Sequence, residues 1–228
     1  IIGAAMGMGM VIGPGIGGLL AGDALSTPFF VGSGLSILAL FLILLFLPES
    51  LPSHNRVHDV HIKGLEIKQI WQALVGPLGY LMVLAFFVFF GLTNFEGIFG
   101  LYADARYDYG PQEVGSIMMV IGIVSSVVQM GLTGPATRRF GESRVIQASL
   151  ISSVLGFVLM TQAETSTAIL LTVGFFIFSN AMLRPAIMSL TSKLAQGGQG
   201  AALGMNNAFQ SLGRVAGPLW AGMMFDLN

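Results

Sequence analysis

No charged side chain occurs between Ile1 and Gly22, and the stretch Gly7–Gly18 contains six glycines and a proline. In water such a segment would be a poor helix, because inside a helix glycine costs about 1 kcal/mol and proline about 3 kcal/mol relative to alanine. In a lipid bilayer every backbone N–H must be paired within its own segment, so even a glycine-rich run becomes helical. The opening segment therefore predicts a helix that crosses a membrane.

The composition of the whole chain agrees with a bilayer as its surroundings. Hydrophobic residues make up 54% of the 228 residues and charged residues only 9%, whereas soluble domains have about 25% charged residues. The net charge of −1 and the lack of a basic tract argue against a nucleic-acid partner. Because the chain has no cysteine, disulfides and thiolate metal sites are excluded, and we expect no cofactor.

A membrane crossing needs about 20 apolar residues, and the chain has seven runs that approach or exceed this length. They are Ile1–Gly22, Pro28–Leu47, Leu78–Ala103, Val114–Gly134, Val145–Gln162, Ala168–Ser189 and Ala201–Phe225. A polar stretch, Pro48–Pro77, separates the second run from the third. The predicted organisation is therefore residues 1–47 with two spans, a linker over residues 48–77, and residues 78–228 with five spans.

Lysine and arginine residues outside the spans are distributed unevenly, which predicts the orientation of the chain. Arg106 stands alone on one side, whereas the alternate loops contain Arg56, Lys63, Lys68, Arg138, Arg139, Arg144 and Lys193. By the positive-inside rule the second side, which includes the linker, is cytoplasmic. The linker also contains His54, His58 and His61, but no cysteine or acidic cluster lies beside them, so we expect no metal site.

The glycine-rich pattern of the first span occurs a second time, 204 residues later. The first copy consists of Gly9, Gly13, Pro14, Gly17 and Gly18, and the second of Gly213, Gly217, Pro218, Ala221 and Gly222. Six spans separate the copies from start to start, so both cross the membrane in the same direction, as in a parallel repeat of two six-helix units. The chain would then be a fragment with the fifth to eleventh of twelve helices. Coincidence within a glycine-rich membrane sequence is the alternative.

Several segments resemble signature segments of one family, the Major Facilitator Superfamily. They are the antiporter signature of the fifth helix (Gly9–Gly18), the end of the sixth helix (Phe46–Ser50), the basic loop between the eighth and ninth helices (Gly134–Arg144), part of the tenth helix (Leu183–Ala186) and part of the eleventh helix (Ser211–Gly222). Together they extend over the whole chain and are most similar to the tetracycline and multidrug proton antiporters. The resemblance implies an all-α integral membrane bundle, with about seven of an expected twelve helices present.

The function implied by this resemblance is proton-coupled export of drugs or other small organic molecules by alternating access. The protein would be a multi-pass protein of the bacterial plasma membrane, monomeric when full length, with a small-molecule substrate, protons and the bilayer as its partners. A superfamily transporter of a metabolite or sugar is the alternative, and a seven-helix receptor is a further one. No lysine lies within a span to form a retinal Schiff base, and the enzyme motifs H-E-x-x-H and G-x-S-x-G do not occur.

The resemblance also assigns the first glycine copy and the basic loop to gating. Gly9, Gly13 and Gly17 lie four residues apart on one helix face, and Pro14 removes a backbone hydrogen bond and bends the helix. Such a face would make a tight contact with the eighth helix and seal one side of the transporter, with generic helix packing as the alternative. The gating residues of the cytoplasmic loop would be Arg138, Arg139, Gly141 and Arg144. The loop departs from the family pattern at Arg138, where an acid is common.

Three ionisable residues fall inside predicted spans, and each costs about 2.5–3.5 kcal/mol at the bilayer centre. In the two-unit scheme the seventh and tenth helices line the central cavity, and the eleventh adds a polar stripe. The residues predicted to form a substrate and proton pathway are Glu96, Asn180, Arg184, Asn206, Gln210 and Arg214. A carboxyl group partly removed from water holds a proton more tightly, so Glu96 is the candidate for proton exchange. The alternative is that the charged side chains snorkel to the membrane interface.

Overall fold

The computed structural model describes residues 9, 12, 13, 15–21, 24, 26–47, 75, 76, 78–195 and 199–227. Pro14, with the bend expected there, and most of the linker with its three histidines lie outside the described residues. Within the described residues the regular structure is entirely helical, which confirms the predicted all-α fold class.

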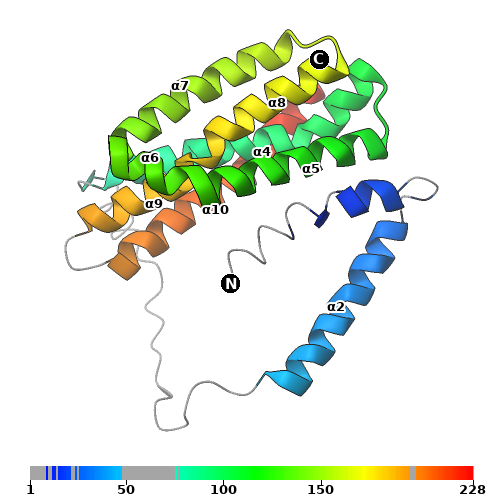
Figure 1. Cartoon of the computed structure of the whole chain (residues 1–228), viewed down its shortest axis with the longest axis horizontal. Coiled ribbons are helices and arrows are strands. Elements are labelled where there is room, and N and C mark those ends of the chain that lie inside the picture. Colours follow the sequence, from blue (N-terminus) through cyan, green and yellow to red (C-terminus); the bar gives the residue numbers. More distant parts are fainter. Residues whose placement is uncertain are drawn as a thin grey trace.

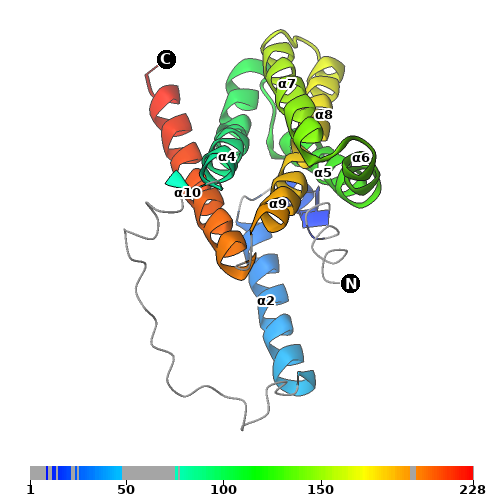
Figure 2. The same cartoon turned by 90° about the vertical axis from the view of Figure 1, so that its left-hand side faces the viewer.

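The helices follow one another with short connections. They are α2 (Thr27–Phe46), α4 (Gly79–Tyr107), α5 (Pro111–Val127), the π-helical turn η2 (Val128–Leu132), α6 (Thr133–Phe140), α7 (Glu142–Thr161), α8 (Ser166–Ala181), α9 (Leu183–Leu194) and α10 (Gln199–Phe225). A short helical segment over residues 15–20 precedes them. Figure 1 shows α4 to α10 gathered into one bundle, with α2 standing outside it, and Figure 2 shows the same separation from the side.

Five of the described helical stretches are long and apolar enough to cross a membrane. Two of the five are composite, since Pro111–Phe140 joins α5, η2 and α6, and Ser166–Leu194 joins α8 and α9. The sequence predicts seven crossings. The seventh corresponds to α10, which is 27 residues long but is not among these five stretches. The first lies only partly within the described residues.

A proline explains why the span Ser166–Leu194 is interrupted. Pro185 has no N–H to donate, and its ring would collide with the carbonyl group of Ala181 in a continuous helix. Accordingly α8 ends at Ala181 and α9 begins at Leu183. The predicted pathway residues Asn180 and Arg184 therefore lie on either side of a one-residue interruption at Met182, where the backbone angles (φ −78°, ψ −23°) remain in the α-helical region.

The basic loop predicted from Gly134 onward is mostly helical, which corrects the sequence-based boundary. The turn η2 is wider than an α-helical turn, and Thr133 Oγ1 donates a hydrogen bond of 3.0 Å to the Val128 carbonyl oxygen. Pro135, which lacks an N–H, is the third residue of α6, and α6 continues to Phe140. The stretch Gly134–Arg144 thus comprises the end of one helix and the start of the next.

Two hydrophobic clusters hold the bundle together. In the first, rings of α4 and α8 meet, with the centroids of Phe95 and Phe176 5.4 Å apart. The helix α7 approaches the backbone of α8 closely, because a β-carbon on Gly156 would lie 2.9 Å from the Phe176 Cα. The second cluster joins α4, α7 and α9 around the buried Phe89 and Ala186.

The helix α2 differs from the bundle in having no buried residue. Large apolar side chains cover its whole surface, among them Phe29 (78% exposed) and Leu45 (73% exposed). A helix that is apolar all round and unburied fits a lipid environment.

Candidate functional site

The first glycine copy contacts α5, the first part of the predicted eighth helix. Gly15, Gly18 and Ala21 are buried. A β-carbon on Gly18 would lie only 2.8 Å from the Gly115 Cα and 2.9 Å from the Pro111 carbonyl oxygen, so only glycine fits there. The two backbones therefore approach each other as small residues permit in membrane helices.

The described part of this helix meets α5 on a different face from the predicted one. A β-carbon on Gly9, Gly13 or Gly17 would meet no atom of another described element within 4 Å. These three glycines instead line an apolar groove whose other wall includes Pro28 and Gly32 at the start of α2. The motif has glycines on two faces of one helix, and spacing alone could not indicate which face meets α5.

The second glycine copy lies against α4. A β-carbon on Gly213 would be 2.5 Å from the Phe86 carbonyl oxygen, and one on Gly217 would be 2.7 Å from the Phe90 carbonyl oxygen. Thr93 lies at the same crossing, and its hydroxyl donates to the Phe89 carbonyl oxygen at 2.7 Å and to the Gly213 carbonyl oxygen at 3.3 Å. The predicted seventh and eleventh helices are thus joined backbone to backbone.

The three predicted intramembrane charges come from different helices of this bundle. Arg214 of α10 and Arg184 of α9 both lie near the ring of Phe89 of α4, with Cζ atoms 4.7 Å and 5.9 Å from the ring centroid. Arg214 also interacts electrostatically with Arg184 and with Glu96. All three charged side chains are exposed on the described chain, whereas Phe89 is only 5% exposed. The buried ring of Phe89 thus lies close to two exposed guanidinium groups.

The neutral residues of the predicted pathway are placed differently from the charged ones. Asn206 and Gln210 are buried, and Gln210 Nε2 donates to Asn206 Oδ1 at 2.5 Å. Asn206 Nδ2 in turn lies 3.5 Å from Thr191 Oγ1 of α9. These amides therefore link α10 to α9. Asn180 is half-buried at the end of α8.

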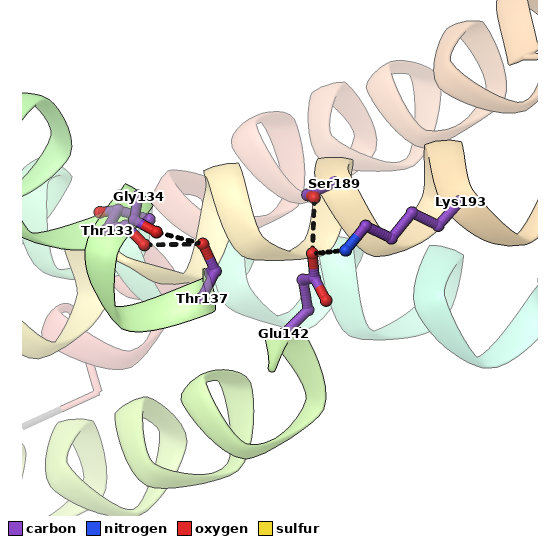
Figure 3. Close-up of polar contacts among 6 residues, drawn as sticks. All are labelled: Thr133, Gly134, Thr137, Glu142, Ser189 and Lys193. Atoms are coloured by element: carbon purple, nitrogen blue, oxygen red, sulfur yellow. Dashed lines mark hydrogen bonds and ion pairs between the residues drawn. The ribbon is translucent and has the colours of Figure 1, made fainter. Parts of the chain in front are cut away.

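The basic segment between the eighth and ninth helices contains an ion pair that the sequence analysis missed. Glu142, at the start of α7, accepts a hydrogen bond of 2.9 Å from Ser189 Oγ and forms an ion pair with Lys193, both on α9 (Figure 3). The preceding residue, Gly141, has φ +82°, a conformation that favours glycine. The available signal was an acid directly after this glycine, in a segment otherwise rich in arginine.

The predicted gating arginines do not take part in this ion pair. Arg138 and Arg139 end α6 and are exposed, and the Arg139 guanidinium lies 5.4 Å from the Phe140 ring centroid. Arg144 is exposed in the first turn of α7. The hydroxyl of Thr137 bonds back within α6, to the carbonyl oxygens of Thr133 and Gly134 (Figure 3). Among the described residues, no group of three or more histidine, aspartate or glutamate side chains could hold a metal ion.

Comparison with known proteins gives a family match over nearly the whole chain. Residues 1–223 match the Major Facilitator Superfamily. Multidrug resistance protein 2 of Bacillus subtilis is 33% identical, over 100% of this chain and 57% of that protein. Multidrug resistance protein 1 of the same organism is 35% identical, and quinolone resistance protein NorA of Staphylococcus aureus 31%, each over 99% of this chain and 57% of the relative.

Among solved structures, the crystal structure of the human organic anion transporter MFSD10 (TETRAN) has the same fold. It superposes with a TM-score of 0.69 at 22% sequence identity and covers 96% of this chain and 55% of that chain. The chain thus spans a little over half the length of the relatives that it matches. With several membrane-crossing helices and a family match from residue 1 to residue 223, the chain belongs to the Major Facilitator Superfamily, a family of multi-pass membrane transporters.

Proposed function

We propose that the chain is part of a secondary active exporter that moves drugs or other small organic molecules across the plasma membrane in exchange for protons. The observation that carries the proposal is a group of three charged side chains: Arg184 and Arg214 lie near the buried ring of Phe89, and Glu96 interacts electrostatically with Arg214. Ionisable residues inside spans are costly, and where they occur they usually mark a path for substrate or ions. The resistance proteins among the relatives support drugs as the substrate class.

The two glycine contacts support a rocking movement between repeat units. Residues 15–21 belong to the first unit of the proposed repeat, and α5 belongs to the second, so their contact at Gly18 and Gly115 lies between the two units. The contact of α10 with α4 lies within the second unit. In alternating access one unit moves against the other around a central site. We therefore assign the Gly18 contact to the moving interface and the Gly217 contact to the rigid part.

Glu96 is the residue that we assign to proton exchange. Its carboxylate interacts electrostatically with Arg214, so a change of charge at one group alters the free energy of ionisation at the other. A substrate that binds near Arg214 would thereby affect the proton on Glu96. This gives a physical link between substrate and proton without any cofactor.

Transport into inverted membrane vesicles tests this assignment. In a complete transporter that contains this chain, an imposed proton gradient should drive uptake of ethidium or of 2-naphthoate, and an uncoupler should stop it. Glu96→Gln should abolish the dependence on the gradient, whereas the control Glu164→Gln, an exposed acid between α7 and α8, should keep it. Gradient-driven uptake of neither probe, or unchanged coupling in Glu96→Gln, would contradict the proposal.

The proposed orientation places two segments in the cytoplasm. They are residues 48–77, which link the end of one six-helix unit (1–47) to the next (78–228), and Gly134–Arg144 within the second unit. These 228 residues contain no cysteine, so this part of a transporter adds no background to a single introduced cysteine. A cysteine at Ser143 should react with a membrane-impermeant maleimide only in inverted vesicles. One at Glu164 should react only in intact cells. The opposite pattern would reverse the topology.

A further inference from the structure

Three arginines gather where one apolar span ends and the next begins. The stretches Pro111–Phe140 and Glu142–Thr161 are both long and apolar enough to cross a membrane, and a single residue separates them. Arg138 and Arg139 lie in the last turn of the first stretch, and Arg144 lies in the first turn of the second. A turn between two successive crossings lies at the surface of the bilayer. The three guanidinium groups of this α6–α7 turn, residues 138–144, therefore lie at the level of the lipid headgroups.

The three guanidinium groups have no carboxylate partner within the described residues. The single acid of the α6–α7 turn, Glu142, is already paired with Lys193 and accepts a hydrogen bond from Ser189 (Figure 3). All three arginines are exposed. The turn therefore has three free positive charges that an anion at the bilayer surface can reach.

An exposed aromatic ring lies next to these charges. Phe140 is 53% exposed, and the Arg139 guanidinium lies 5.4 Å from its ring centroid. An arginine that lies over a ring keeps the N–H groups at the edge of its plane free for another group. Helices that bind to a membrane surface likewise combine basic side chains with apolar ones such as phenylalanine. The turn thus has an anion-binding part and an apolar part, which a phospholipid matches and a water-soluble anion does not.

The opposite end of the bundle has the reverse charge. Among the described residues there, five acids accompany one exposed arginine, Arg106 in the last turn of α4. The acids lie at the ends of α4 and α10, at the start of α5 and between α7 and α8, and they are Asp104, Asp108, Glu113, Glu164 and Asp226. Anionic headgroups are repelled at that end and attracted at the α6–α7 turn. Arg106 is therefore a matched control for the three arginines.

We propose that Arg138, Arg139 and Arg144 bind the phosphate of an anionic phospholipid in the leaflet next to the α6–α7 turn. A guanidinium group can donate two parallel N–H···O bonds to a phosphate group, and basic side chains beside a transmembrane helix attract anionic headgroups. The ring of Phe140 would contact the hydrocarbon just below the headgroup. In the proposed orientation this leaflet is the cytoplasmic one. The site requires neither a transported substrate nor a proton gradient, so it is independent of the proposed function.

Lipid retention by the purified protein tests the proposal. A complete transporter that contains this chain is mixed in detergent with equal amounts of phosphatidylglycerol and phosphatidylcholine, and the bound lipids are counted by native mass spectrometry. The parent should retain phosphatidylglycerol, the anionic lipid, in preference. Arg138→Gln/Arg139→Gln/Arg144→Gln should raise the Kd for phosphatidylglycerol about tenfold or more, because each basic group near an anionic headgroup adds a several-fold preference. The control Arg106→Gln should leave the Kd unchanged.

A single variant tests the proposal in the opposite direction. Glu142→Gln removes the only acid of the α6–α7 turn and frees Lys193 from its ion pair, so it should lower the Kd for phosphatidylglycerol. This variant remains informative if the triple variant does not fold, although its exposed positions predict an unfolding temperature equal to that of the parent.

Four results would overturn the proposal. They are an equal Kd in the parent and a folded triple variant, an equally large rise in Arg106→Gln, a rise in Glu142→Gln, and displacement of phosphatidylglycerol by inorganic phosphate at the same concentration. The last result would mean that the turn binds a soluble anion and not a lipid. A Kd that falls in Glu142→Gln and rises in the folded triple variant supports the proposal.

Discussion

In α10, Gly213 and Gly217 lie against the backbone of α4, whereas Gly9 and Gly13, which hold the same places in the first copy of the pattern, have open space where a β-carbon would be. The first copy uses Gly15 and Gly18 for its contact with α5. The residue of α10 that corresponds to Gly15 is Leu219, which is 64% exposed. Each copy therefore packs through the face that the other leaves open.

The difference shows that a repeated small-residue pattern predicts close approach of backbones but does not identify the partner helix. Glycines at several positions give a membrane helix more than one smooth face, and either face can accept a neighbouring backbone. The helix that is present beside each face decides which one is used. The two copies can thus differ in role, one in the proposed moving interface and the other in the rigid bundle.

The largest effect should come from adding one methyl group to the second copy. Gly217→Ala would place its β-carbon 2.7 Å from the Phe90 carbonyl oxygen and 2.9 Å from the Asn94 nitrogen, so that α4 and α10 must separate. Overpacking of this kind costs about 1–3 kcal/mol, and more where backbone must move. We expect a clear fall in the thermal unfolding temperature of the purified protein in detergent.

The matched variant in the first copy is Gly13→Ala, 204 residues earlier. With no atom within 4 Å of the new β-carbon, it should leave stability unchanged or raise it slightly, because alanine favours a helix by about 1 kcal/mol over glycine. A similar loss of stability in both variants would remove the distinction between the two copies.

A smaller effect, and a different one, is expected at the contact with α5. Gly18→Ala would bring a methyl group to 2.8 Å from the Gly115 Cα, which should weaken this one contact and leave the α4 to α10 bundle folded. Transport should fall sharply while the unfolding temperature changes less than in Gly217→Ala. Gly17→Ala, the neighbouring glycine with open space, should transport normally. If Gly17→Ala is the damaging variant, the face assignment is reversed.

Much of the fold could be predicted from the sequence, because the bilayer leaves a long apolar run little choice but a helix. The glycine spacing likewise indicated close helix contacts. The ion pair of Glu142 with Lys193 could not be predicted in this way, since the two residues are 51 positions apart. Periodicity placed Asn206 on the same stripe as Arg214 but could not show that its amide is buried and bonded to Thr191 of α9 and Gln210 of its own helix.

The smallest loss of stability should come from breaking the ion pair of Glu142 with Lys193 within the second unit. Lys193 is largely exposed, with 62% of its side chain accessible, whereas the Glu142 side chain is 12% accessible. An ion pair with one exposed partner contributes about 0.2–1 kcal/mol and weakens with salt. A double-mutant cycle of Glu142→Gln and Lys193→Gln should therefore give a small coupling energy of unfolding. This energy should be unchanged when Gly18→Ala is added, because the two contacts lie in different parts of the molecule. A dependence on Gly18→Ala would mean that the ion pair and the α5 contact move together.

The central claim is that the first glycine copy contacts α5 through the face of Gly15 and Gly18 and not through that of Gly13 and Gly17. A disulfide between this helix and α5 tests it most directly. The β-carbon position on Gly15 lies 3.6 Å from the Met119 Cβ, within the range of about 3.5–4.5 Å that a disulfide needs. The chain has no other cysteine. With a protease site inserted between residues 48 and 77, Gly15→Cys/Met119→Cys should oxidise and hold the two cleaved parts together until a reductant is added, and Gly13→Cys/Met119→Cys should not. Closure of the 13–119 pair in place of the 15–119 pair would contradict the account.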